Sequence, residues 1–121
     1  MRDDVVQLPR DAGLGATLKV KGEKRRLSAA VDLSAYRIVQ EAITNVLKHA
    51  NASRVEVAID YEREGIALTI SDNGSGPGED LSAGHGLIGM RERVALFGGK
   101  MGTGSTPLGG FTVHARLPYE N

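Results

Sequence analysis

Residues 34–50 read SAYRIVQEAITNVLKHA and decide how the rest of the chain is interpreted. Apolar side chains recur through this stretch at helical spacing and form one stripe on a helix. We therefore expect the main helix of the fold here, capped by Asp32 or Ser34 and ended by residues 51–53. The stripe consists of Tyr36, Val39, Ile43, Val46, Leu47 and Ala50.

The opposite face of this predicted helix carries a second pattern, made of Glu41, Asn45, Lys48 and His49. An acid and an amide one turn apart can hold a hard cation and a water. A lysine one turn further along can meet phosphate oxygens. The alternative for this segment alone is a solvated helix face that binds nothing.

Outside this helix, the pattern of apolar residues predicts five strands and a second helix. The order of elements is not the strict alternation of a doubly wound fold. It predicts an α+β two-layer sandwich in which a mostly antiparallel mixed sheet carries its helices on one face. The expected elements are an edge strand over 16–20, a hairpin over 54–72 turning at 63–65, a helix over 87–97 ended by Gly98 and Gly99, and a hairpin of 100–103 with 110–117.

Composition narrows the class of function. The 121 residues carry 15 basic and 15 acidic side chains, so there is no general attraction to nucleic acid or to an anionic membrane. The absence of cysteine excludes disulfides, thiolate metal sites and a cysteine nucleophile. The sequence contains no apolar run that could span a bilayer. Residues 1–13 are weakly patterned and are interpreted as a fragment boundary.

Glycine is concentrated in one third of the chain, because 12 of the 16 glycines lie between Gly74 and Gly110. Residues 72–76, DNGSG, place a carboxylate at the end of a predicted strand, where it can accept a hydrogen bond from an exocyclic amine; the alternative is an ordinary turn. Residues 84–89, GHGLIG, lead into a helix start that favours phosphate. A glycine-rich loop without a ligand is the alternative for that second segment.

Together these segments resemble the ATP-binding catalytic domain of bacterial sensor histidine kinases, which has the Bergerat fold shared with DNA gyrase B, Hsp90 and MutL proteins. Residues 40–50 resemble the N box of that family, 72–76 its first glycine box, 84–94 its second, and 102–113 its third. The resemblance covers about residues 33–118 of what we expect to be a single domain, 1–121. Residues 89–93, GMRER, resemble the corresponding segment of the sensor kinases that pair with NarL/LuxR-type response regulators.

The resemblance implies a role for each matching residue. Glu41 would orient or deprotonate the attacking group, and Asn45 would coordinate Mg²⁺ bridging the phosphates of ATP. Lys48 and His49 would lie near phosphate or ribose. Asp72 would bind the adenine amine, helped through water by Thr112. Gly76 would lie beside the ring, and residues 77–86 would form the lid, with Gly84, Gly86 and Leu87 closing over the phosphates. The remaining nucleotide-binding residues would be Gly74 and His85.

The resemblance also implies partners that residues 1–121 do not supply. Sensor kinases phosphorylate a histidine on dimerising helices that precede this domain, and no histidine precedes His49. We therefore expect Mg-ATP binding without self-labelling, a homodimer of the full-length protein, a NarL/LuxR-type response regulator, and a cytoplasmic location. The alternatives are an anti-sigma-factor-type protein-serine kinase and a non-catalytic domain that binds a nucleotide or a partner.

Overall fold

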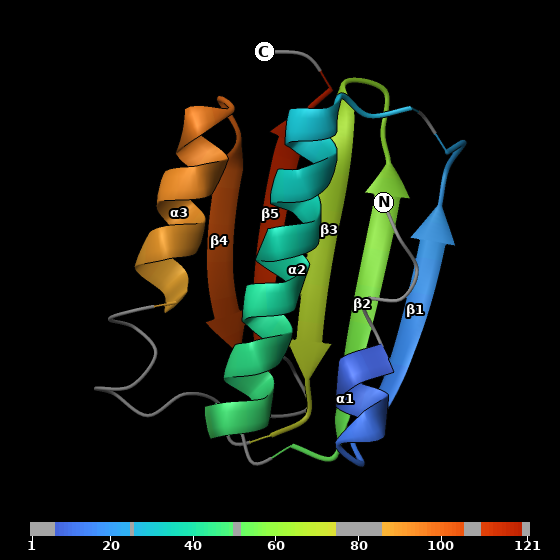
Figure 1. Ribbon diagram of the computed structural model, residues 1–121, viewed down its shortest axis with the longest axis vertical. Coiled ribbons are helices and arrows are strands. Elements are labelled where there is room, and N and C mark those ends of the chain that lie inside the picture. Colours follow the sequence, from blue (N-terminus) through green and yellow to red (C-terminus); the bar gives the residue numbers. More distant parts are fainter. Residues whose placement is uncertain (1–6, 25, 50–51, 75–85, 106–109, 120–121) are drawn as a thin grey trace.

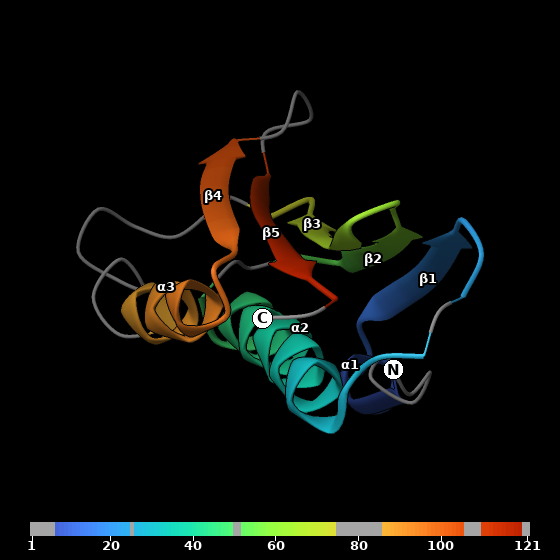
Figure 2. The same cartoon turned by 90° about the horizontal axis from the view of Figure 1, so that it is seen from above.

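A computed structural model describes residues 7–24, 26–49, 52–74, 86–105 and 110–119. Five strands form one sheet in the order β1-β2-β3-β5-β4. The three helices lie on one face of that sheet (Figures 1 and 2). Three of the four strand pairs are antiparallel and one, β1 with β2, is parallel. The predicted α+β two-layer architecture is therefore confirmed.

The order along the chain is α1, β1, α2, β2, β3, α3, β4, β5. Among these, α1 was not expected, because its five residues lie in the weakly patterned N-terminal stretch. The predicted edge strand, both hairpins and the second helix are confirmed, with ends shifted by a few residues. The bounds are α1 Gln7–Asp11, β1 Gly15–Lys21, α2 Ala29–His49, β2 Arg54–Tyr61, β3 Gly65–Asp72, α3 Gly86–Leu96, β4 Lys100–Ser105 and β5 Phe111–Pro118.

Helix α2 begins five residues earlier than the sequence predicts, and the prediction of its cap was wrong. The hydroxyl of Ser28 accepts a hydrogen bond from the backbone N–H of Val31 at 3.2 Å, which is the bond of an N-cap residue. Asp32 instead lies in the first turn, where its negative charge interacts favourably with the positive end of the helix dipole. Ser34 is buried within the helix.

The core lies between the sheet and α2. Alternate residues of the central strands face the helices, so Ile70 of β3 pairs with Val57 of β2 and Val113 of β5, and all three are buried. Met90 of α3 is fully buried at the same interface. This alternation fixes which face each polar residue of β3 and β5 occupies.

Helix α3 ends at the two glycines that the sequence marks. Gly98 has φ +72, and the N–H of Gly99 donates to the carbonyl of Val94 at 3.0 Å. The chain then turns directly into β4, which places α3 beside α2 over the β4 side of the sheet (Figures 1 and 2). No helix in the described ranges is long and apolar enough to cross a membrane.

Candidate functional site

Asp72 is a buried carboxylate at the end of β3. It pairs with Val55 of β2 and shares the alternation of Leu68 and Ile70, so it lies on the helix-covered face of the sheet. Its Oδ1 accepts a hydrogen bond from the backbone N–H of Gly74 at 2.8 Å. Asp72 therefore matches both interpretations of the sequence. One of its oxygens closes an ordinary turn, and the residue is also a carboxylate at a strand end that is only 7% exposed.

The next residue, Asn73, binds the chain that leads into β2. Its side-chain Oδ1 accepts hydrogen bonds from the backbone N–H groups of Ser53 at 3.0 Å and Arg54 at 2.9 Å. Its Nδ2 donates to the hydroxyl of Ser53 at 2.9 Å. Asn73 thus fixes the position of the strand end that carries Asp72.

Gly110 packs directly against the same strand end. A Cβ at this position would lie 1.7 Å from the carbonyl oxygen of Asp72 and 3.0 Å from the Cα of Asn73. Only glycine allows the start of β5 to approach so closely. The first and third glycine-containing segments of the sequence are therefore in contact at Asp72.

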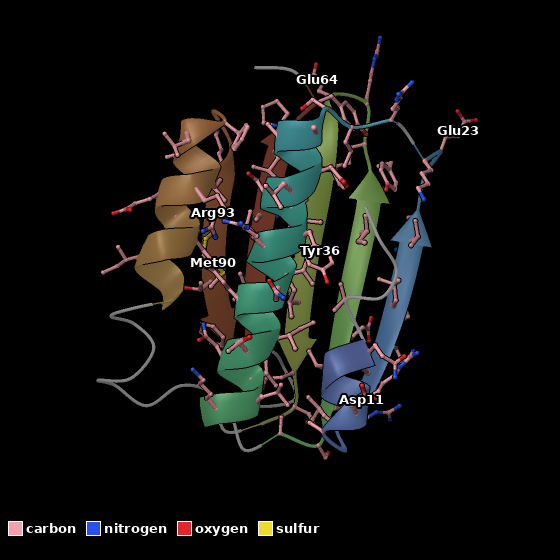
Figure 3. The ribbon with its side chains drawn as sticks, viewed as in Figure 1. Asp11, Glu23, Tyr36, Glu64, Met90 and Arg93 are labelled. Atoms are coloured by element: carbon pink, nitrogen blue, oxygen red, sulfur yellow. The ribbon has the colours of Figure 1, made fainter. Side chains whose placement is uncertain are left out.

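The polar face of α2 meets α3 at one ion pair. Arg93 Nη1 donates to Oε1 of Glu41 at 2.7 Å. Figure 3 shows Arg93 and Met90 extending from α3 toward α2. One turn after Glu41, Asn45 is half-buried, and Lys48 beyond it is exposed. The solvated-face alternative therefore describes Lys48 but not Glu41.

The structure brings three of the predicted segments to one end of the molecule. The C-terminal end of α2, the end of β3 and the first residues of α3 lie in the lower part of Figure 1. Gly74 is described beside Asp72. Gly86 and Leu87 begin α3, and His49 ends α2. The structure does not describe the side chains of Leu87 and His49. Gly76, Gly84 and His85 lie outside the described residues.

Thr112 lies on a different face of the sheet from Asp72, although both residues were assigned to the nucleotide. It pairs with Ser71 across β3 and β5, and their hydroxyl oxygens are 3.2 Å apart. Ser71 and Thr112 alternate with the residues that face the helices, so they occupy the opposite face of the sheet from Asp72. Phe111, which precedes Thr112, has the parity of the helix-covered face and packs against the core.

Sequence reasoning missed two residues that the structure places at this site, Arg93 and Asn73. The signal for Arg93 was present, because it lies three residues after Met90 on the inward side of the predicted helix. The side-chain role of Asn73 had no comparable signal, since its partners are backbone groups about twenty residues away.

The donor set bears on which metal could bind. Within the described residues, no group of three or more His, Cys, Asp or Glu side chains could hold a metal ion. The amide oxygen of Asn45 is nevertheless a hard ligand of the kind that Mg²⁺ accepts when phosphates and water complete its coordination. The described side chains thus fit a magnesium ion that is shared with a phosphate ligand.

Comparisons with known proteins agree with this geometry. The family described as histidine kinase-, DNA gyrase B- and HSP90-like ATPase matches residues 30–121. The chain is 34% identical over 108 residues to the signal transduction histidine-protein kinase/phosphatase DegS of Brevibacillus brevis, covering 88% of this chain and 28% of that protein. It is 38% identical over 90 residues to the histidine-protein kinase/phosphatase UhpB of Salmonella typhimurium, covering 74% and 18% respectively.

A solved structure shows the same arrangement. The ATP-binding domain of PrrB from Mycobacterium tuberculosis aligns with a TM-score of 0.71 and 26% identity, covering 98% of this chain and 93% of that one. The chain spans less than a third of the length of DegS and UhpB. It belongs to the histidine kinase-, DNA gyrase B- and HSP90-like ATPase family and is a catalytic ATP-binding domain of the sensor histidine kinase type.

Proposed function

We propose that this domain binds Mg-ATP and transfers the γ-phosphoryl group to a histidine on a separate dimerisation domain. The observation that carries the proposal is the buried carboxylate of Asp72, held on the helix-covered face at the end of β3. It lies at the same end of the fold as the polar turns of α2 and the start of α3 (Figure 1).

Asp72 would recognise adenine. Its Oδ1 is engaged by the N–H of Gly74, which leaves Oδ2 to accept a hydrogen bond from the exocyclic amine. Gly74 and Gly76 would let the backbone approach the ring. Phe111, rather than Thr112, is the β5 residue on this face, so we propose that Phe111 borders the base and that Thr112 has no part in binding it.

The triphosphate would extend from Asp72 toward α2 and the start of α3. Asn45 would hold Mg²⁺, which supplies charge neutralisation between the phosphates when it is bound. Lys48 and His49 would add donors near the phosphates or ribose. The backbone N–H groups at the start of α3 would favour phosphate, with Gly84, His85, Gly86 and Leu87 completing that end.

Glu41 would act on the attacking group. The incoming imidazole attacks the γ-phosphorus with one ring nitrogen while the bond to the bridging oxygen breaks, and ADP leaves. The Glu41 carboxylate would accept a hydrogen bond from the N–H of the other ring nitrogen. This bond would orient the ring, and the carboxylate would accept that proton as positive charge develops on the imidazole. The chemistry therefore rests on positioning and charge, without a covalent intermediate on this domain.

The partners follow from the same proposal. The acceptor histidine would lie on dimerising helices outside residues 1–121, in a full-length homodimer working in the cytoplasm. The receiver of the phosphoryl group would be a NarL/LuxR-type response regulator. The support for this type is the GMRER segment at 89–93 together with the similarity to DegS and UhpB.

One titration and one variant test the proposal. Calorimetry should detect ATP binding that strengthens when Mg²⁺ is added, and the domain alone should take up no acid-labile label from γ-labelled ATP. With a purified phosphoacceptor hairpin, Glu41→Gln should lower phosphotransfer by about 10²- to 10⁴-fold while ATP still binds. Unchanged phosphotransfer by that variant would show that Glu41 does not act on the attacking group. ATP binding without phosphotransfer by the unmodified domain would favour the non-catalytic alternative, and absence of ATP binding would overturn the proposal entirely.

A further inference from the structure

The contact between Glu41 and Arg93 joins two helices that are far apart in sequence. The two residues are 52 positions apart, and their N–O distance of 2.7 Å is that of a charge-assisted hydrogen bond. Their side chains are 35% and 25% exposed, so the pair is partly shielded from water. The pair is therefore better defined than a fully exposed surface ion pair, which contributes little.

The geometry of the pair leaves half of the carboxylate available. Nη1 of Arg93 is bonded to Oε1 of Glu41 only. In the described part of the chain, Oε2 of Glu41 has no hydrogen-bond partner. A guanidinium that holds one oxygen fixes the direction in which the other oxygen points. This is the arrangement of a base that is oriented by a third group.

Arg93 is held in turn by the packing of its own helix. Met90, one turn before it, is fully buried, and Val94, which follows it, is 1% exposed. Figure 3 shows Met90 and Arg93 on the side of α3 that faces α2. The neighbouring Arg91 is exposed instead. The sequence thus places two arginines on one helix, of which one meets Glu41 and the other faces solvent.

We propose that Arg93 is the positioning residue for Glu41, holding Oε1 so that Oε2 is directed at the attacking group. The proposal rests on the proposed function, because it assigns a role to Arg93 only if Glu41 acts on the phosphoacceptor. Arg93 itself would touch neither ATP nor the acceptor. Its loss should therefore lower the rate of transfer and leave the affinity for ATP unchanged.

The test compares Arg93→Met, Arg93→Lys and the matched control Arg91→Met in phosphotransfer to a purified phosphoacceptor hairpin. Arg93→Met should lower kcat by about 10- to 100-fold, as expected when a reacting group is misplaced, with the KM for ATP unchanged. Because the ion pair uses a single donor, Arg93→Lys should recover kcat to within about threefold. Arg91→Met should match the unmodified chain.

A charge exchange separates positioning from stabilisation. Glu41→Arg combined with Arg93→Glu restores opposite charges between α2 and α3 but removes the carboxylate from α2. We expect this double variant to regain the Tm lost by the single variants and to remain inactive. If both Tm and phosphotransfer recover, the pair is only structural and the inference is overturned.

The two proposals fail in different ways. If Glu41→Gln keeps full phosphotransfer, the role of Glu41 is wrong and the proposed mechanism fails with it. If Glu41→Gln is inactive but Arg93→Met keeps its kcat, the mechanism stands and the role of Arg93 is wrong. If Arg93→Met raises the KM for ATP with kcat unchanged, Arg93 belongs to nucleotide binding and the inference is likewise overturned.

Discussion

The side chain of Asn73 binds Ser53 twice, accepting from its backbone N–H at 3.0 Å and donating to its hydroxyl at 2.9 Å. A third bond, from the N–H of Arg54 at 2.9 Å, completes the contact. Through these bonds the segment after α2 and the strand end before Gly74 form one rigid corner. Because Asn73 directly follows Asp72, these bonds help to fix the strand end that carries the carboxylate.

Asn73→Ala should therefore lower both stability and ATP affinity. Loss of three hydrogen bonds, two of them from backbone groups, should reduce the free energy of unfolding by about 1–3 kcal/mol. Asn73→Asp is the matched variant, because its carboxylate still accepts from both N–H groups, and it should lose less than half as much. Urea denaturation measures the difference; equal midpoints for the unmodified chain and Asn73→Ala would contradict this role.

Asp72→Asn should weaken ATP binding by about 1.5–3 kcal/mol, because a charge-assisted hydrogen bond to the adenine amine is lost. Calorimetric titration at fixed Mg²⁺ measures this change. Thr112→Val is the control on the same pair of strands: its hydroxyl bonds Ser71 on the opposite face, so its ATP affinity should equal that of the unmodified chain. A comparable loss in Thr112→Val would restore the adenine role first assigned to Thr112.

Nucleotide choice tests Asp72 without any substitution. Guanine presents a carbonyl where adenine presents an amine, so the carboxylate of Asp72 would face an acceptor instead of a donor. GTP should bind at least about fivefold more weakly than ATP, since an unpaired buried polar group costs about 1 kcal/mol or more. Competition titration of the two nucleotides measures the ratio, and equal affinities would exclude Asp72 as the group that reads the base.

Gly110→Ala should destabilise the domain strongly. The added Cβ would lie 1.7 Å from the carbonyl oxygen of Asp72, a backbone atom that cannot rotate away. We expect a loss of about 2 kcal/mol or more, the scale of overpacking with backbone movement. Gly102→Ala is the control, because no atom lies within 4 Å of the Cβ it would add. Thermal unfolding of the two variants side by side decides the point; equal Tm values would refute the close contact.

The sequence predicts the layers of this fold because alternation and helical spacing are local properties. The hairpin over 54–72 and the helix that stops before Gly98 and Gly99 follow from them directly. Thr112 shows that a motif and strand alternation can point in different directions: the alternation of Phe111, Val113 and Ala115 indicates that Thr112 lies on the other face of the sheet, whereas the motif assigns it to the nucleotide. A resemblance assigns residues by position in a motif, whereas strand parity decides the face.

The ion pair of Glu41 with Arg93 could not be predicted in the same way. Each residue lies on a helix that the sequence indicates, but no local pattern states that the two helices pack side by side with those turns in register. That information resides in the turn at Gly98 and Gly99 and in the order of β5 and β4. Tertiary packing, rather than propensity, brings the two charges together.

The start of α2 provides a final prediction, because it was placed at the wrong residue. Asp32 and Ser34 are good capping residues by type, yet the first turn begins at Ala29 and the cap is Ser28. Ser28→Ala should therefore cost about 1 kcal/mol of unfolding free energy, the usual value of a lost N-cap. Ser28→Asp should keep most of it, because a carboxylate can accept the same bond from Val31 and favours the helix dipole. Urea unfolding of both variants measures the effect, and a Ser28→Ala midpoint equal to that of the unmodified chain would place the cap elsewhere.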